Sequence, residues 1–243
     1  MNGVRVLIVG GSGAIGGELA GILSAAGARV VVAGRDRPRL EAVAARTGAL
    51  AEHVEATDSA SMDALFDRSA EALGGLDAVV SCVGSVLLKP AHRTSPEEWG
   101  QVLATNLSSA FWVVRAAGRV MTGGGAVVLT STAAAQVGLP NHEAIAAAKA
   151  GIEGLIRSAA ATYAPRNLRF NVVAPGLVRT PLTAGIVNHA PSLAASLALH
   201  AVRRVGEPGD VARMMAFLVD PRNDWITGEV FSVDGGLGRI KAR

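Results

Sequence analysis

The chain has 243 residues, of which 50% are hydrophobic and 18% charged, and its formal net charge is +3 at pH 7. This balance excludes a disordered or fibrous protein and is typical of a compact domain with a large apolar core. The basic residues are spread along the chain and form no runs interleaved with aromatic residues, so we expect no nucleic-acid binding. A single domain covering residues 1–243 is expected, because an α/β core of this length need not be divided.

Three sequence features bear on where the protein works. A strand-like run begins at residue 4 and leaves no room for a secretion signal, and glycines and charges interrupt each apolar stretch that could span a bilayer. The one cysteine, Cys82, cannot form an internal disulfide, and its strand-like surroundings predict a buried side chain. The five histidines lie far apart, without Cys or carboxylate partners at metal-ligand spacing. We therefore expect a cytoplasmic protein with no membrane partner and no metal.

Strand-like and helix-like segments alternate along the chain. Runs rich in β-branched residues predict strands at 4–9, 28–34, 50–55, 76–82, 125–131, 168–175 and 228–236. Ala-rich segments with helical periodicity predict helices at 15–26, 38–46, 61–73, 97–121, 143–163 and 210–218. Such alternation predicts right-handed crossovers and an α/β fold with a parallel, doubly wound sheet.

Residues 180–205 interrupt this alternation, because prolines at 181 and 191 flank a mixed apolar and polar stretch. Irregular segments of this length are typical of a lid or substrate loop. Its many Ala, Leu and Val residues favour a small apolar or mixed substrate.

The first predicted strand continues into "VLIVGGSGAIGGELA", which reads as a strand, a glycine turn and a helix start. Gly11, Gly13 and Gly16 fit the pattern G-x-G-x-x-G, in which missing side chains let a pyrophosphate approach backbone N–H groups at a helix N-terminus. A second strand follows at the distance expected in a dinucleotide-binding unit, which favours dinucleotide binding. The alternative is a glycine turn with only a structural role. The predicted contacts to the pyrophosphate are Gly10, Ser12, Gly13 and Ile15.

The end of the second predicted strand bears on the choice of coenzyme. A carboxylate at this position would bind the adenosine ribose of NAD, whereas an arginine can pair with the extra phosphate of NADP. Here Gly34 is followed by Arg35 and then Asp36. We expect NADP(H) in preference to NAD(H), with Arg35 on the 2′-phosphate. The alternative is that Arg35 is a solvated cation and Asp36 binds the ribose.

Longer motifs extend this pattern over nearly the whole chain. They are "VGGSGAIG", "LDAVVSCVG", "WGQVLATNLSSAF", "AVVLTST", "AIAAAKAG", "RFNVVAPGLVRTPL" and "RRVGEPGDVARMMAFLVDPRNDWITGEVFSVDGGL". With these motifs the chain resembles the short-chain dehydrogenase/reductase family. The resemblance implies a seven-stranded Rossmann-type sheet, a homodimer or homotetramer, and hydride transfer between a nicotinamide and the carbonyl or alcohol group of a small molecule.

The resemblance also implies an active site of Asn, Ser, Tyr and Lys, with Tyr and Lys spaced Tyr-x-x-x-Lys on one helix face. In this chain Asn106 and Lys149 match, Thr132 occupies the serine position and Ile145 occupies the tyrosine position. The one tyrosine, Tyr163, lies more than three turns beyond Lys149, so no shift of register can supply a phenol. We expect Asn106, Thr132 and Lys149 at the reacting centre, and Ser131 is the alternative to Thr132.

Further coenzyme contacts are implied by the same resemblance. Glu55 and Ala56 are expected near the adenine, Gly84 after the fourth strand, and Lys149 on the nicotinamide ribose. The residues expected to line the nicotinamide are Pro175, Gly176, Val178 and Thr180.

A hydrocarbon at the tyrosine position leaves three hypotheses for function. Another group could supply the proton, either His142, which shares a helix face with Ile145 and Lys149, or Lys149 acting through water and Asn106. Alternatively, the substrate could need no acid, as with an imine or an activated alkene whose oxyanion is held by Thr132. We expect an NADP(H)-dependent oxidoreductase of one of these kinds. The third hypothesis is a noncatalytic NADP-binding sensor or silent subunit of a mixed oligomer.

Overall fold

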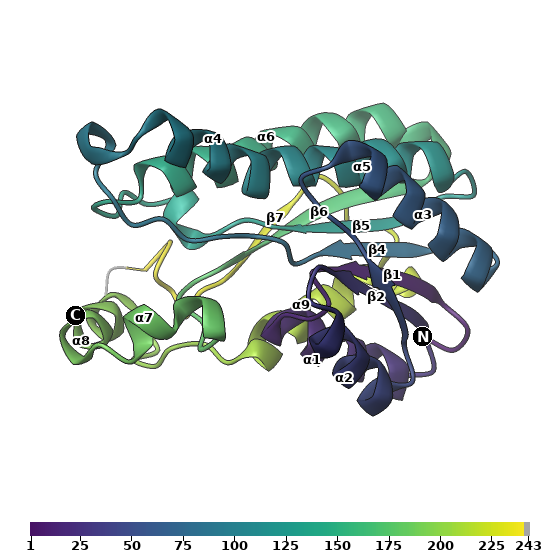
Figure 1. Cartoon of the computed structure of the whole chain (residues 1–243), viewed down its shortest axis with the longest axis horizontal. Helices are drawn as coiled ribbons and strands as arrows, with labels where there is room; N and C mark the ends of the chain where they lie inside the picture. The colour runs from purple at the N-terminus through teal and green to yellow at the C-terminus, as the bar shows by residue number, and fades with distance from the viewer. Residues whose placement is uncertain (241–243) are drawn as a thin grey trace.

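The computed structural model describes residues 1–240, in which a seven-stranded parallel sheet lies between two layers of helices (Figure 1). The strand order is β3-β2-β1-β4-β5-β6-β7, and each neighbouring pair is parallel. The predicted doubly wound, seven-stranded Rossmann-type sheet is therefore confirmed. The strands are β1 (Arg5–Val9), β2 (Arg29–Gly34), β3 (Leu50–His53), β4 (Ala78–Ser81), β5 (Gly125–Thr130), β6 (Leu168–Pro175) and β7 (Val230–Val233).

Helices cover both faces of the sheet, which is why the central strands are apolar without alternation. In β1, Leu7 and Val9 pack into one core while Val6 and Ile8 pack into the other, as the two-residue period of a strand requires. One layer contains α1 (Ala14–Ala25), α2 (Arg37–Thr47) and α9 (Pro208–Val219), below the sheet in Figure 1. The other contains α3 (Ser59–Leu73), α4 (Pro96–Leu103), α5 (Ser109–Val120) and α6 (Glu143–Tyr163).

The helix expected at 97–121 is present without a gap, but it is not α-helical throughout. The segment divides into α4, a π turn (η2, Ala104–Ser108) and α5. A π turn adds one residue to a helical turn and occurs frequently at functional sites. Asn106 lies within the π turn, and the extra residue changes the direction in which this candidate side chain projects.

The predicted lid is more helical than its prolines suggest. After the short turn η5 (Pro181–Thr183) it forms α7 (Ala184–Val187) and α8 (Ala190–Leu199). Pro191 is accepted at the start of α8 because the first helical residues need no N–H partner. The remaining short turns are η1 (Ala91–Arg93), η3 (Ala133–Ala135), η4 (Ala164–Arg166) and η6 (Pro221–Asn223).

Within residues 1–240, no single helix has the length and apolar character needed to cross a bilayer. The segments Pro181–Val187 and Ala190–Leu199 meet these criteria only when taken together, and they are bent by 97° with respect to each other.

Candidate active site

The loop between β1 and α1 leaves no space for side chains at two positions. Gly10 has a φ of +82°, and a Cβ there would lie 2.9 Å from the carbonyl carbon of Cys82. A Cβ on Gly16 would lie 2.5 Å from the Gly10 carbonyl oxygen. Glycine is therefore required at both positions.

The N-terminus of α1 is suited to an anion. None of the side chains in residues 1–240 caps it, its N-cap is Gly13, and its first turn contains no acidic residue. By contrast, Asp36, Asp58 and Ser95 cap α2, α3 and α4. The free N–H groups of the first turn of α1, together with its dipole, can therefore bind a phosphate group. Ser12 precedes the N-cap and Ile15 is the second residue of α1, and their contacts to a pyrophosphate stay a prediction.

Arg35 and Asp36 have different surroundings at the end of β2. Asp36 Oδ1 accepts a hydrogen bond from Arg39 N at 3.1 Å, which makes its carboxylate the N-cap of α2. Arg35 has a side chain that is 73% exposed and lies 3.8 Å from Glu55. Partial burial would raise the pKa of the Glu55 carboxyl, but hydrogen bonds from Thr57 and the charge of Arg35 outweigh it and lower this pKa. Arg35 is thus available to an anion, whereas Asp36 already has a structural partner.

At the carboxyl ends of β4 and β5, Lys149, Asn106 and Gly84 come together. Lys149 is 5% exposed, and its Nζ donates to Thr130 O at 2.8 Å and to Val83 O at 3.4 Å. A Cβ built on Gly84 would lie 3.3 Å from Lys149 Nζ and 3.2 Å from Asn106 Oδ1. Three of the predicted residues from distant parts of the sequence are therefore neighbours.

Asn106 is held in one orientation by its partners. Its Oδ1 accepts a hydrogen bond from Ser85 N at 3.0 Å, and its Nδ2 donates to Ser85 Oγ and to Val102 O, both at 2.9 Å. These bonds pass from the π turn to the loop after β4 and keep the amide, which is 1% exposed, beside Gly84.

Burial changes the protonation of the two ionisable groups in this region. It lowers the pKa of the Lys149 ammonium from 10.5 to about 8, and the adjacent Cys82 offsets a small part of that shift. It raises the pKa of the Cys82 thiol to about 12. The thiol therefore stays neutral, and its sulfur lies 3.8 Å from the sulfur of Met215. The expectation of a buried strand residue is met only in part, because Cys82 follows the last residue of β4 and the residue as a whole is only partly buried.

The two hydroxyls after β5 face different partners. Ser131 Oγ donates a hydrogen bond to Glu153 Oε1 at 2.9 Å, so its proton is not available to a substrate. Thr132 Oγ1 accepts from Ala134 N at 3.3 Å as the N-cap of η3. A hydroxyl that accepts one bond can still donate one, so Thr132 is the hydroxyl with a free proton.

Ile145 forms an apolar wall one helical turn before Lys149. It is 5% exposed and packs in a small cluster with Val102 and Ala148, against which Leu87 and Leu107 also lie. No hydrogen-bond donor replaces the phenol in this cluster of described residues.

His142 is bound to its own loop. Its Nδ1 lies 2.7 Å from the Pro140 carbonyl oxygen, and the residue is the N-cap of α6. The contact gives the imidazole a backbone partner within its own loop.

The four residues predicted to line the nicotinamide follow one another along the end of β6. Pro175 is the last residue of the strand, Val178 forms a bridge with Gly206, and Thr180 caps η5. A Cβ on Gly176 would lie 2.7 Å from His200 Nε2, so glycine is needed here as well. Ala56, expected near the adenine, is buried.

His200 is a structural residue that sequence reasoning did not identify. It is 2% exposed, its Nε2 accepts from Leu177 N at 3.2 Å, and its Nδ1 lies 2.7 Å from Ser196 O. It thereby joins α8 of the lid to the end of β6. Such an isolated histidine has no spacing signal in the sequence, because its partners are backbone groups.

A metal-binding cluster was not expected from the sequence. Among residues 1–240, His, Cys, Asp and Glu side chains form no group of three that could hold a metal ion. What the site offers is an uncapped helix N-terminus at α1 that can bind an anion and, at the same edge of the sheet, an ammonium, an amide and a hydroxyl.

Comparisons with known proteins identify the family. Residues 10–238 match the family model described as enoyl-(acyl carrier protein) reductase. The chain is 35% identical to a cis-4-hydroxycyclohexanecarboxylate dehydrogenase of Sinomonas cyclohexanicum, with 97% of both chains covered. It is 36% identical to an inactive 2-(S)-hydroxypropyl-CoM dehydrogenase 2 of Xanthobacter autotrophicus, with 88% of this chain and 97% of the relative covered.

Solved structures agree with this assignment. A short-chain type dehydrogenase/reductase from Mycobacterium ulcerans superposes with a TM-score of 0.94 at 30% identity, covering 100% of this chain and 92% of the other. A putative short-chain alcohol dehydrogenase from Sinorhizobium meliloti gives a TM-score of 0.92 at 33% identity, with 98% and 97% covered. The chain therefore belongs to the short-chain dehydrogenase/reductase family of oxidoreductases, which bind NAD(H) or NADP(H).

Proposed function

We propose that the protein is an NADP(H)-dependent oxidoreductase that transfers hydride to or from a small organic substrate without a tyrosine acid. The substrate carries a carbonyl, an activated alkene or an imine. The proposal rests mainly on one observation, which is the buried ammonium of Lys149 beside Gly84 and Asn106, with the hydrocarbon of Ile145 one turn away.

The coenzyme would be held by groups at one edge of the sheet. The loop Gly10–Gly16 and the N-terminus of α1 would bind its pyrophosphate, and Arg35 its 2′-phosphate. Glu55 and Ala56 would lie near its adenine, and Lys149 would bind its nicotinamide ribose. When bound, the coenzyme supplies or accepts the hydride. The nicotinamide would be lined by Pro175, Gly176, Val178 and Thr180.

Lys149 is suited to stabilise negative charge on the substrate and to supply a proton. An ammonium has three N–H donors, and bonds to Thr130 O and Val83 O use two of them, which leaves one. That remaining N–H would contact the nicotinamide ribose, so the proton would reach the substrate through water and Asn106. A pKa of about 8 keeps the group mostly protonated at pH 7 while making it a better acid than a free lysine. The free O–H of Thr132 adds a second donor for a developing oxyanion.

The proposal is tested in two steps. Purified protein is titrated with NADPH and NADH, and nicotinamide fluorescence is expected to show saturable binding that is tighter for NADPH. Ketones, enones and cyclic imines are then supplied with NADPH, and its absorbance is followed. Turnover of any of these supports the enzyme. Tight NADPH binding with no turnover of any substrate supports a sensor or silent subunit instead, and absence of binding contradicts both.

Replacing Arg35 by glutamine tests the coenzyme preference. We expect NADPH affinity to fall about ten-fold or more, because a charge-assisted phosphate contact contributes about 1.5–3 kcal/mol. NADH affinity is expected to change less than about two-fold. Arg37→Gln is the matched control, since Arg37 is likewise mostly exposed and pairs with Glu41 on the same helix. Equal losses for NADPH and NADH in Arg35→Gln would contradict the assignment.

Replacing His142 by alanine tests the competing proton donor. Because the imidazole is bonded to Pro140 O at the start of α6, we expect turnover to stay within about two-fold of the parent. The quantity to measure is kcat/KM between pH 6 and 9. A loss of 100-fold with unchanged NADPH binding would assign the proton to His142 and remove it from Lys149.

A further inference from the structure

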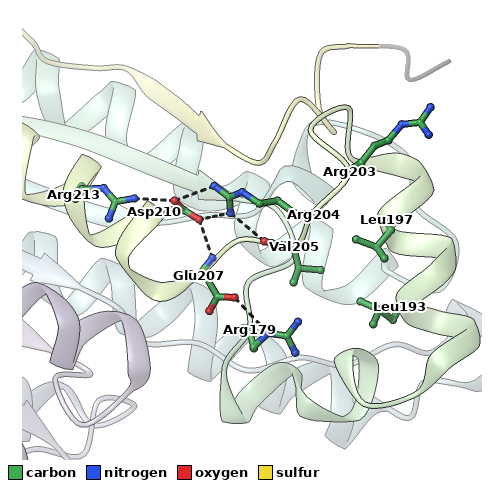
Figure 2. A pocket seen from close by; sticks show the side chains of 9 residues that line it. All are labelled: Arg179, Leu193, Leu197, Arg203, Arg204, Val205, Glu207, Asp210 and Arg213. Carbon is green, nitrogen blue, oxygen red and sulfur yellow. Dashed lines mark hydrogen bonds and ion pairs between the residues drawn. The ribbon is translucent and has the colours of Figure 1, made fainter.

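A second cavity lies outside the candidate active site, between α8 of the lid and the start of α9 (Figure 2). Its volume is about 520 Å³. None of its lining residues belongs to the groups assigned to the coenzyme or to the reacting centre. They are Arg179, Leu193, Leu197, Arg203, Arg204, Val205, Glu207, Asp210 and Arg213.

The cavity carries a net positive charge, because four arginines and two carboxylates line it. Asp210 is already fully engaged, since it accepts bonds from Arg204 at 2.6 and 3.1 Å, from Arg213 at 2.8 Å and from Glu207 N at 2.9 Å. These bonds, with that from Arg204 the largest contribution, lower the pKa of Asp210 to about 2. Asp210 therefore fixes the positions of two guanidinium groups and does not titrate under ordinary conditions.

Two of the arginines keep hydrogen-bond donors for a ligand. Arg179 contacts Glu207 through Nε alone, at 3.4 Å, and both side chains are more than half exposed. Arg213 contacts Asp210 through one terminal nitrogen. Each guanidinium carries five N–H groups, so both have donors without a partner among residues 1–240. In Figure 2, Arg213 projects from α9 beside Asp210, and the guanidinium of Arg179 lies below Glu207 and points toward Leu193.

The opposite side of the cavity is apolar. Leu193 and Leu197 project from successive turns of α8 in Figure 2, and both are partly exposed. Residues spaced i and i+4 lie about 6 Å apart, which defines a short hydrocarbon surface. The cavity therefore combines guanidinium N–H groups of Arg179 and Arg213 that have no partner among residues 1–240 with an apolar wall that nothing in the described chain covers.

We propose that this cavity binds a small amphiphilic anion, that is, a carboxylate or phosphate monoester carried on a short hydrocarbon chain. Arg179 and Arg213 would bind the anionic head, because guanidinium groups match carboxylate and phosphate oxygens in geometry and charge. Leu193 and Leu197 would contact the hydrocarbon. A bound ligand would bridge the lid and α9. The site does not depend on the proposed catalytic role of Lys149.

Methyl NMR of the leucine-labelled protein tests the site directly, with NADPH present so that the coenzyme loop is occupied. The probes are hexanoate and hexyl phosphate, and hexanol is the uncharged control. We expect saturable shifts of the Leu193 and Leu197 methyl signals with at least one anion, and at least about ten-fold weaker binding of hexanol. Raising the salt from 50 to 500 mM should weaken anion binding several-fold. Equal affinities for hexanol and both anions would overturn the proposal.

The double variant Arg179→Gln/Arg213→Gln is expected to bind the anion at least about ten-fold more weakly, with the leucine signals otherwise unchanged. The control is Arg68→Gln, which removes an exposed arginine of α3 that pairs with Glu52 of β3, and there the affinity should stay within about two-fold. Unchanged affinity in the double variant, or an equal loss in the control, would show that these two guanidinium groups do not form the site.

Discussion

The variant Lys149→Met is expected to lose turnover and to gain stability. Burial lowers the pKa of this lysine from 10.5 to about 8. At about 1.4 kcal/mol per pKa unit, the charged side chain costs the fold about 3 kcal/mol at pH 7. Methionine removes that cost but also removes the bonds to Thr130 O and Val83 O, so we expect a net gain of about 1–2 kcal/mol. Turnover should fall about 100-fold or more, because the cation and the proton donor are lost together.

Urea unfolding at several pH values, together with kcat/KM, measures both effects. Between pH 8 and 10.5 the unfolded chain binds a proton at Lys149 that the folded chain has released, so the stability of the parent protein should rise with pH across this window. Lys149→Met should lack that rise. The control is Lys89→Met, because Lys89 is partly exposed and paired with Glu98. A Lys149→Met protein that is less stable than the parent would contradict the burial cost of the charge, and one as active as the parent would contradict the catalytic role.

The variant Ile145→Tyr is expected to gain reduction of simple ketones. The phenol would lie on the same face of α6 as Lys149, one turn before it, where the ammonium can lower its pKa and it can act as a general acid. A positioned acid contributes about 10²- to 10⁴-fold in rate. Because Ile145 is buried among Val102, Ala148 and Leu107, the larger ring should cost about 1–3 kcal/mol of stability.

Ile145→Phe is the matched control, since it adds a ring of nearly the same size without the hydroxyl. Both variants should lose similar stability in thermal unfolding, and only Ile145→Tyr should gain ketone reduction with NADPH. The double variant Ile145→Tyr/Lys149→Met should lose the gain. If Ile145→Phe gained as much activity as Ile145→Tyr, the rate would depend on pocket shape, and the missing phenol would not be the reason for weak ketone reduction.

The sheet could be predicted from the sequence because each central strand is an apolar run between glycine or polar segments, and this pattern needs no knowledge of distant contacts. The π turn at Asn106 could not, since it inserts one residue into a helix without a compositional signal. The meeting of Lys149, Asn106 and Gly84 depends on how β4, β5 and α6 pack. Only the family resemblance, and not the spacing along the chain, suggested it.

The sequence contains signals for two local features, the Asp36 cap of α2 and the helices of the lid, that could have been predicted. Asp36 is followed by Pro38 and a helical segment, which is a recognisable helix start and would have favoured the capping role for its carboxylate. The helices of the lid were hidden by prolines at 181 and 191, yet both prolines stand at the first positions of a helical turn, where they are accepted. His200 had no comparable signal.

The lid begins and ends at nearly the same point of the scaffold. Arg179 N donates to Gly206 O and Gly206 N donates to Leu177 O, both at 2.8 Å, while His200 binds Leu177 N. A loop whose two ends are adjacent can be lengthened, shortened or exchanged at little entropic cost and without moving the strands beneath it. New substrate preferences could therefore arise by replacing the lid alone, while the nucleotide-binding half of the molecule stays unchanged.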